Sequence, residues 1–284
     1  MPLPPLRAES LLDQVIELCR KAGEAILEVY HHSEGFDVDT KSDDSPVTAA
    51  DLAAHSILEP GLQSLLPNVP VLSEEGTIPD YEVRRQWPQY WLIDPLDGTK
   101  EFVNRNGEFT VNVAFVHEGR PILGVVHVPV TDVTYGGYTD STGKGVAFKC
   151  EQGQRHALQS RSVEGLGTRE RPVMVVASRN HGAAEVVALL NRVGEQLGEV
   201  NTRSLGSSLK LCLIAEGAAD LYPRLAPTCE WDTAAAQAIV EAAGGAVLND
   251  HFEPLQCNQG ESLLNPHFFV VGDPQFDWAG ILES

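Results

Sequence analysis

The sequence predicts a layered fold in two lobes, the first of the α+β class and the second of the α/β class, and three patterns along the chain lead to this prediction. Apolar residues recur at helical spacing over residues 10–29. Residues 109–138 alternate between apolar and polar side chains, with turn residues between the runs, which is typical of an antiparallel meander. From residue 173 onward, short apolar strands alternate with helical segments, which indicates stacked helices and sheets.

The first lobe is predicted to begin with two helices. Ser10 and Asp13 form a capping-box start for the first helix, whose apolar stripe runs to Val29. Residues 31–44 are polar and acidic, and they predict a loop or a mobile hairpin. We expect the second helix over residues 48–66, because Pro67 stops it.

Predicted β structure follows these helices. A short buried strand over residues 90–93 is expected to end at Asp94. Residues 109–116, 122–130 and 133–138 form the meander, with a turn at residues 118–120. Residues 151–170 are polar and indicate a seam, so we expect one lobe over residues 1–160 and a second over residues 161–284.

The second lobe is predicted to alternate strands and helices. Strands are expected over residues 173–177, 219–222, 246–248 and 268–271. Helices are expected over residues 183–193, 207–216 and 232–243, and the last two end at Gly217 and at the glycine pair of residues 244–245.

Composition and charge exclude several classes of protein. The chain has 284 residues, no apolar run long enough for a membrane helix and no secretory signal, so we expect a cytoplasmic protein. Its five cysteines are scattered without a C-x-x-C pair, which fits reduced thiols. A formal net charge of −20 repels a nucleic-acid backbone. An anionic substrate would therefore need a local reversal of charge, which bound metal cations would supply most simply.

The most informative segment is residues 94–99, which read Asp-Pro-Leu-Asp-Gly-Thr directly after a buried strand. A turn here would aim the carboxylates of Asp94 and Asp97 and the Leu96 carbonyl at one point. Oxygen ligands without nearby histidine or cysteine suit a hard cation such as magnesium. Gly98 and Thr99 would then offer backbone N–H groups and a hydroxyl to a phosphate.

Three further acidic sites lie at the ends of predicted elements: Glu74 with Glu75 after an apolar run, Asp232 before an alanine-rich helix, and Asp51 after Thr48. Each has a plain structural alternative. Asp232 fits a helix N-cap, Thr48 with Asp51 fits a capping box, and the glutamate pair fits a solvated turn. Taken together with the Asp94 segment, the four sites favour a metal cluster.

Other catalytic chemistries find no support in the sequence. The chain contains no G-x-S-x-G elbow, no G-x-x-x-x-G-K-[ST] loop, no G-x-G-x-x-G fingerprint and no H-E-x-x-H pair. Asp94 and Asp97 are three residues apart, which disfavours a covalent aspartyl-phosphate mechanism of the D-x-D type. Among the nine histidines only His181, after a Ser-Arg-Asn run, is a functional candidate.

These blocks together resemble the lithium-sensitive, magnesium-dependent inositol monophosphatase superfamily, in an order and spacing that cover essentially the whole chain. The resemblance implies a two-lobed αβαβα sandwich with the active site between the lobes. It implies two or three Mg²⁺ ions held by Glu74, Asp94, Asp97, Asp232 and the Leu96 carbonyl. Thr99 with Asp51 would orient and deprotonate the attacking water, Glu75 would support the metal ligands, and the amides of Gly98 and Thr99 would hold the scissile phosphate.

Finer features resemble the bisphosphate nucleotidase branch of this superfamily. Lysines stand at Lys100 and Lys210, where inositol monophosphatases usually carry no lysine, and a second phosphate on the substrate would explain both; solvated surface lysines are the alternative. The resemblance gives Ser207, Ser208, Lys210, Arg224 and His181 as candidates for the nucleoside and the second phosphate. Lys100 and the metal-binding residues Glu74, Leu96, Asp97 and Asp232 are expected to line the same substrate site.

The resemblance therefore implies hydrolysis of the 3'-phosphate of adenosine 3',5'-bisphosphate by a metal-activated water, without a covalent intermediate. Two alternatives stay open: an inositol or sugar monophosphatase with the same metals, and a non-catalytic magnesium-dependent binding protein. A weak peripheral association with the cytoplasmic face of the inner membrane is a further alternative, although the sequence has no basic amphipathic helix for it.

Overall fold

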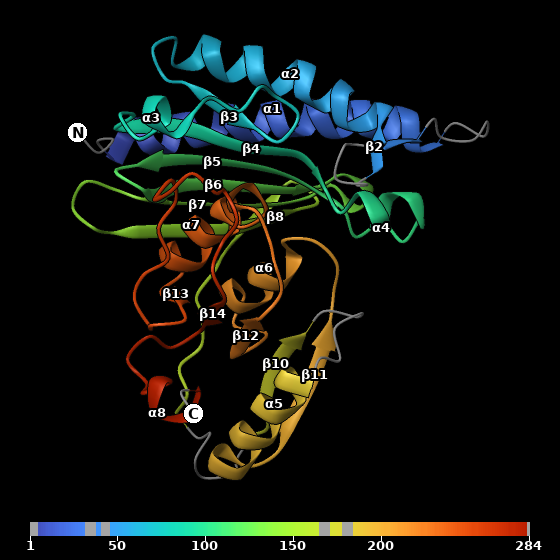
Figure 1. The fold of residues 1–284 in the computed structure, drawn as a ribbon. Coiled ribbons are helices and arrows are strands. Elements are labelled where there is room, and N and C mark those ends of the chain that lie inside the picture. Colours follow the sequence, from blue (N-terminus) through green and yellow to red (C-terminus); the bar gives the residue numbers. More distant parts are fainter. Residues whose placement is uncertain (1–4, 32–37, 41–45, 165–170, 178–183, 283–284) are drawn as a thin grey trace.

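The computed structural model describes residues 5–31, 38–40, 46–164, 171–177 and 184–282. Helices and sheets alternate in five layers, which Figure 1 shows from top to bottom. The predicted αβαβα sandwich is therefore confirmed. The lobe boundary at residue 160 stays a prediction. None of the described helices is long and apolar enough to cross a membrane, and the five cysteines form no disulfide.

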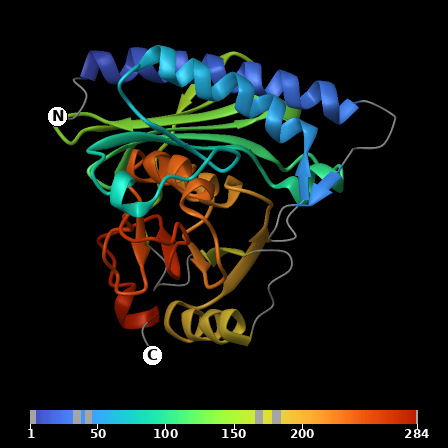
Figure 2. The same ribbon diagram turned by 45° about the horizontal axis from the view of Figure 1, so that its top comes forward.

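The outer layer consists of two long helices, α1 (Pro5–His31) and α2 (Ala49–Leu65), which lie side by side on one face of the first sheet (Figure 2). The apolar stripe predicted for α1 is buried, and Leu12, Val15 and Ile26 on it are fully inaccessible to solvent. Two short strands, β1 (Val38–Thr40) and β2 (Pro46–Thr48), pair antiparallel and lead into α2. The first turn of α2 thereby follows directly from a strand.

The second layer is a seven-stranded sheet in the order β3-β4-β5-β6-β7-β8-β9. Only β3 runs parallel to its neighbour, and the remaining pairs are antiparallel. Its strands are β3 (Val71–Ser73), β4 (Gln89–Asp97), β5 (Thr110–His117), β6 (Arg120–Val128), β7 (Val133–Thr139), β8 (Gly145–Glu151) and β9 (Gln154–Ala157). Three short helical segments join them: α3 (Tyr81–Arg84), α4 (Thr99–Val103) and η1 (Pro129–Thr131). The predicted meander is confirmed.

The polar seam predicted from residue 151 begins too early, because β9 extends the first sheet to Ala157. All four residues of β9 are exposed, since it is the last strand at the edge of the sheet. A strand with no buried face has no apolar alternation, and the sequence therefore carries no signal for it.

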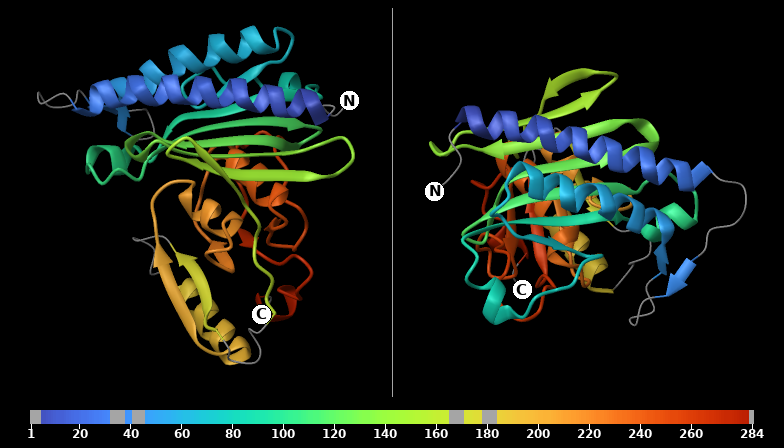
Figure 3. Two further views of the ribbon diagram at one scale, coloured as in Figure 1. Left: turned by 180° about the vertical axis from the view of Figure 1, so that it is seen from behind. Right: turned by 90° about the horizontal axis from the view of Figure 1, so that it is seen from above.

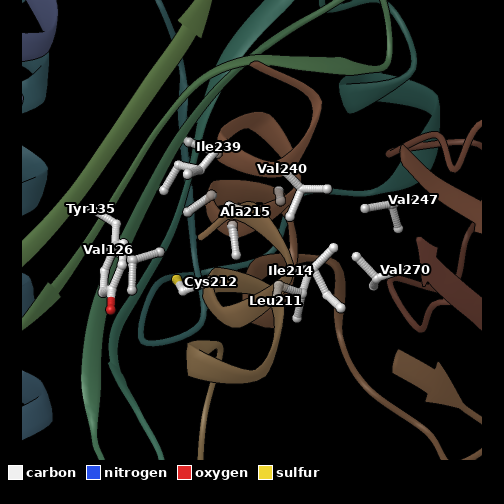
Figure 4. Packing of buried hydrophobic residues seen from close by; sticks show 14 of the residues in the cluster. Val126, Tyr135, Leu211, Cys212, Ile214, Ala215, Ile239, Val240, Val247 and Val270 are labelled. Atoms are coloured by element: carbon white, nitrogen blue, oxygen red, sulfur yellow. The ribbon is translucent and has the colours of Figure 1, made fainter. Parts of the chain in front are cut away.

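The middle layer holds two short helices, α6 (Leu209–Ala215) and α7 (Ala234–Ala242), between the two sheets. A short 3₁₀ turn, η3 (Glu230–Asp232), precedes α7. Figure 4 shows side chains of both helices packed against Val126 and Tyr135 of the first sheet and Val247 and Val270 of the second. The core therefore runs continuously from one sheet to the other.

Glycines in three adjacent strands allow α7 to lie directly on the first sheet. They are Gly124 in β6, Gly137 in β7 and Gly145 in β8. A Cβ on Gly124 would overlap the carbonyl oxygen of Ala235 and lie 2.8 Å from its carbonyl carbon. A Cβ on Gly137 would lie 3.0 Å from the Cα of Ile239. The position of α7 is therefore set by backbone contact.

The fourth layer is a five-stranded sheet in the order β11-β10-β12-β14-β13. Its strands are β10 (Val173–Ala177), β11 (Val200–Ser204), β12 (Leu221–Arg224), β13 (Ala246–Asn249) and β14 (Phe268–Val271). Helices α5 (Ala184–Leu197) and α8 (Ala279–Leu282) form the fifth layer against it (Figure 3). The sequence did not predict β11, which is a largely exposed edge strand like β9.

Candidate active site

Three carboxylates from separate elements converge beside strand β4 of the first sheet. Glu74 lies in the turn after β3, Asp94 lies within β4, and Asp232 ends η3. One carboxylate oxygen of each lies within 4.8 Å of the other two. Asp94 is only 2% exposed. An oxygen-only donor set of this kind fits a hard divalent cation such as Mg²⁺.

Strand β4 delivers both of its aspartates to the same side of the sheet. Asp94 pairs with Asn112 and Asp97 pairs with Thr110, so three steps along β4 oppose two steps along β5. Residues three apart in a regular strand point to opposite faces, and the bulge between Asp94 and Asp97 removes this conflict. The turn that we predicted after Asp94 is wrong, because the strand continues through Pro95 to Asp97. The N–H of Leu96 donates to Asp94 Oδ1 at 3.0 Å inside the bulge.

The Asp97 carboxylate is held by a residue of β5 and by a residue just before α6. Its Oδ2 accepts the backbone N–H of Ser208 at 2.6 Å and also lies 3.4 Å from the side-chain amide of Asn112. The Ser208 hydroxyl in turn lies 3.0 Å from that of Thr110 and 2.9 Å from Asn112 Oδ1. One oxygen of Asp97 is therefore engaged by the protein, and the binding of a metal ion by this carboxylate stays a prediction.

Thr110 and Asn112 were not among the residues that we predicted for the site. Both are buried in β5, where an apolar strand is otherwise continuous from Val111 to Val116. Two polar side chains within such a strand are the signal that sequence reasoning missed, because a buried polar group needs a partner.

Burial and mutual repulsion shape the electrostatics of the cluster. Burial raises the pKa of Asp94 well above its usual value, and the charges of Glu74 and Asp97 raise it further. Burial likewise raises the pKa of Asp97 to about 6 and, together with the Asp97 charge, that of Asp232 to about 8. A cation bound between these carboxylates would stabilise their ionised forms, which burial and mutual repulsion otherwise disfavour. The electrostatics thus agree with the donor set.

The predicted phosphate-binding segment begins the short helix α4. Gly98 precedes it with φ of 90°, a left-handed conformation that favours glycine, and a Cβ there would overlap the Ser207 hydroxyl. Thr99 is the first residue of α4, and Lys100 is exposed. Asp51 is 3% exposed in the first turn of α2, and its charge contributes to the raised pKa of Asp94. Glu75 follows Glu74 in the turn after β3.

The two lysines predicted to bind the second phosphate differ in their burial. Lys210 is 7% exposed and donates from Nζ to the Ser207 carbonyl at 2.8 Å. Burial lowers its pKa, although the Asp97 charge acts in the opposite sense. The surface-lysine alternative therefore fails for Lys210, whereas Lys100 is exposed as that alternative expects. The Ser207 hydroxyl lies 2.9 Å from the Asp97 carbonyl and 2.7 Å from that of Glu108.

Arg224 and His181 are the two other candidates for the nucleotide. The Arg224 guanidinium donates to the carbonyls of Ala226 and Pro227, both at 3.0 Å. His181 lies outside the residues that the structure describes. The substrate contacts of all these residues stay predictions.

The N-cap alternative for Asp232 does not match its contacts. Its Oδ2 accepts the N–H of Cys229 at 2.9 Å, which closes the 3₁₀ turn and not the first turn of α7. The cap position of α7 is Thr233, without a side-chain cap. Asp232 is therefore directed by η3 toward Glu74 and Asp94.

Comparisons with known proteins agree on one family. The inositol monophosphatase family matches residues 7–268 of this chain. A protein of Escherichia coli K12 named 3'(2'),5'-bisphosphate nucleotidase CysQ is 52% identical over 260 residues, which cover 92% of this chain and 99% of that protein. A protein of the same name from Haemophilus influenzae is 38% identical and covers 97% of each chain.

Solved structures give the same result. The crystal structure of CysQ from Bacteroides thetaiotaomicron superposes with a TM-score of 0.77 at 41% identity, over 94% of this chain and 98% of that chain. The inositol monophosphatase of Anabaena has a TM-score of 0.69 at 21% identity, over 94% and 92% of the two chains, which is a similarity of fold alone.

Proposed function

Because this chain belongs to the inositol monophosphatase family, we propose that it is a magnesium-dependent phosphomonoesterase acting on adenosine 3',5'-bisphosphate. It removes the 3'-phosphate and releases AMP and phosphate. The observation that carries the proposal is the convergence of the Glu74, Asp94 and Asp232 carboxylates in a chain whose net charge is −20. The names of the relatives from Escherichia coli and Haemophilus influenzae support this choice of substrate.

The protein's own groups would divide the work of hydrolysis between them. Glu74, Asp94, Asp97, Asp232 and the Leu96 carbonyl would hold two or three Mg²⁺ ions. These ions, when bound, supply charge neutralisation for the phosphate and a more acidic water. The Thr99 hydroxyl would orient the attacking water, and the Asp51 carboxylate would accept its proton through that hydroxyl. The backbone amides of Gly98 and Thr99 would hold the scissile phosphate, and Glu75 would support the ligand set.

The second phosphate of the substrate would need positive charge beyond the metal ions. The buried ammonium of Lys210 supports this assignment, because it lies close enough to Asp97 for their charges to interact. Lys100 and Arg224 would add positive charge at the rim. Ser207, Ser208 and His181 are the remaining candidates for contacts to the nucleoside.

The decisive test compares two substrates in the presence of magnesium. Phosphate release is measured from adenosine 3',5'-bisphosphate and from inositol 1-phosphate, side by side, with Asp94→Asn as the blank. A preference for the bisphosphate supports the proposal, and a preference for inositol 1-phosphate replaces it with the monophosphatase alternative. Release from neither, together with binding of the bisphosphate, would favour a non-catalytic binding protein. Full activity of Asp94→Asn would contradict the metal site.

The role of Lys210 can be tested separately from the chemistry. Lys210→Ala should raise KM for the bisphosphate by roughly 10-fold or more, because a charge-assisted hydrogen bond contributes about 1.5–3 kcal/mol. KM for inositol 1-phosphate should change far less. The matched control is Lys149→Ala, which removes a partly buried lysine that is paired with Glu216 at 3.3 Å. Equal effects of Lys210→Ala on both substrates would contradict the assignment.

A further inference from the structure

Three hydrogen-bonded side chains lie behind the turn that carries Glu74 and Glu75. Ser73 ends β3 and is 3% exposed. Its Oγ lies 3.0 Å from Nδ1 of His55, in α2. The other ring nitrogen of His55, Nε2, lies 3.2 Å from Oε2 of Glu59, one helical turn further along α2. The backbone N–H of Glu75 donates to Ser73 Oγ at 3.3 Å.

The Glu59 carboxylate sets the direction of the hydrogen bonds in this group. A carboxylate can only accept, so in the neutral ring of His55 the proton lies on Nε2 and is donated to Glu59. His55 Nδ1 then accepts the hydroxyl proton of Ser73, whose Oγ accepts the Glu75 N–H. The bonds run in one direction, from the Glu75 amide through Ser73 and His55 to the Glu59 carboxylate.

The turn that this group supports is also fixed to β4. Gly76 donates its N–H to the Ser73 carbonyl at 3.1 Å, which closes the turn around Glu74 and Glu75. Glu74 donates its own N–H to the carbonyl of Ile93 at 3.2 Å. Ile93 directly precedes Asp94, so the turn and the strand bring their carboxylates together. The Ser73 side chain supports the second half of this turn by accepting the Glu75 N–H.

We propose that His55, oriented by Glu59, is a positioning residue for the metal centre. It holds the Ser73 hydroxyl in the rotamer that accepts the Glu75 amide, and thereby fixes the direction of the Glu74 carboxylate toward Asp94 and Asp232. This inference rests on the proposed function, because it takes Glu74 to be a magnesium ligand. Residues behind the ligands of a metal site typically change metal affinity or activity by about 10- to 100-fold when they are lost.

The test is the magnesium affinity of the intact protein, measured by calorimetric titration and by the dependence of thermal unfolding on MgCl₂. The variants are His55→Phe, which keeps a ring without nitrogen, and Ser73→Ala, which removes only the hydroxyl. The matched control is Thr134→Val, because Thr134 also bonds a buried imidazole through its hydroxyl, at 2.9 Å from His127 Nδ1, away from the turn. His55→Asn restores an acceptor near the position of Nδ1.

We expect the Kd for Mg²⁺ to rise about 10-fold in His55→Phe and Ser73→Ala, to stay at the wild-type value in Thr134→Val and to recover in part in His55→Asn. Excess MgCl₂ should restore kcat in both weakened variants. Wild-type affinity in His55→Phe or, if that variant does not fold, in Ser73→Ala overturns this inference alone. Failure of the wild-type protein to bind Mg²⁺ would overturn the proposed function, and this inference with it.

Discussion

Alanine at position 124 would place a methyl group of β6 against the backbone of α7. The added Cβ would overlap the Ala235 carbonyl oxygen and lie 2.8 Å from the carbonyl carbon and 3.0 Å from Ala238 Cβ. Carbon atoms normally approach to about 3.5–4.0 Å, so α7 would have to withdraw by roughly 1 Å. Overpacking of this kind costs about 3 kcal/mol at the upper end of its range, and the reduced freedom of the unfolded chain offsets about 1 kcal/mol.

We therefore expect Gly124→Ala to lower the free energy of unfolding by about 2 kcal/mol, measured by urea denaturation without metal. Because Asp232 lies two residues before α7, the variant should also bind Mg²⁺ more weakly. Gly260→Ala is the matched control, because nothing lies within 4 Å of the Cβ that it adds. If the two variants unfold at the same urea concentration, backbone contact does not set the position of α7.

Three other changes have distinct expected outcomes. Asp94→Asn should abolish turnover yet stabilise the metal-free protein at neutral pH, since the raised pKa of Asp94 means that its ionised form opposes folding; calorimetric unfolding in EDTA tests this. Burial lowers the pKa of His127 to about 4. The free energy of unfolding should therefore be at its full value above pH 6.5 and fall by up to about 3 kcal/mol as the pH falls toward 4, because protonation then favours the unfolded chain. His127→Gln should flatten this part of the profile of stability against pH. Gly194→Ala should stabilise α5 by about 0.5–1 kcal/mol, because its Cβ would make only an ordinary 3.6 Å contact with Val200; an unchanged urea midpoint would contradict it.

Periodic patterns and local motifs were sufficient to predict the layered fold. The buried stripe of α1 and the meander from β5 to β7 follow from alternation of side chains with a buried face. The same reasoning selected Glu74, Asp94 and Asp232 from 40 acidic residues, because each stands at the end of an apolar run or at the start of a helix. These features could be predicted because each depends on residues that are close together along the chain.

Features that depend on distant partners were not predictable in this way. Asp97 receives the N–H of Ser208 from a segment more than a hundred residues later, and no pattern near either residue announces the contact. Lysine is normally a surface residue, but Lys210 is buried because α6 lies between two sheets. The bulge at Pro95 likewise depends on the register of β5, which is set by pairing and not by the motif itself.

The place of α7 in the middle layer has a consequence for the synthesis of the protein. The seven-stranded sheet is complete once residue 157 has left the ribosome, but its inner face is covered by α7, which begins at residue 234. At ordinary translation rates this face stays exposed for on the order of ten seconds before α7 is synthesised. An apolar sheet exposed for that time is a binding surface for chaperones and a starting point for aggregation. Chains that terminate before residue 234 should therefore be insoluble, although they contain every strand of the first sheet.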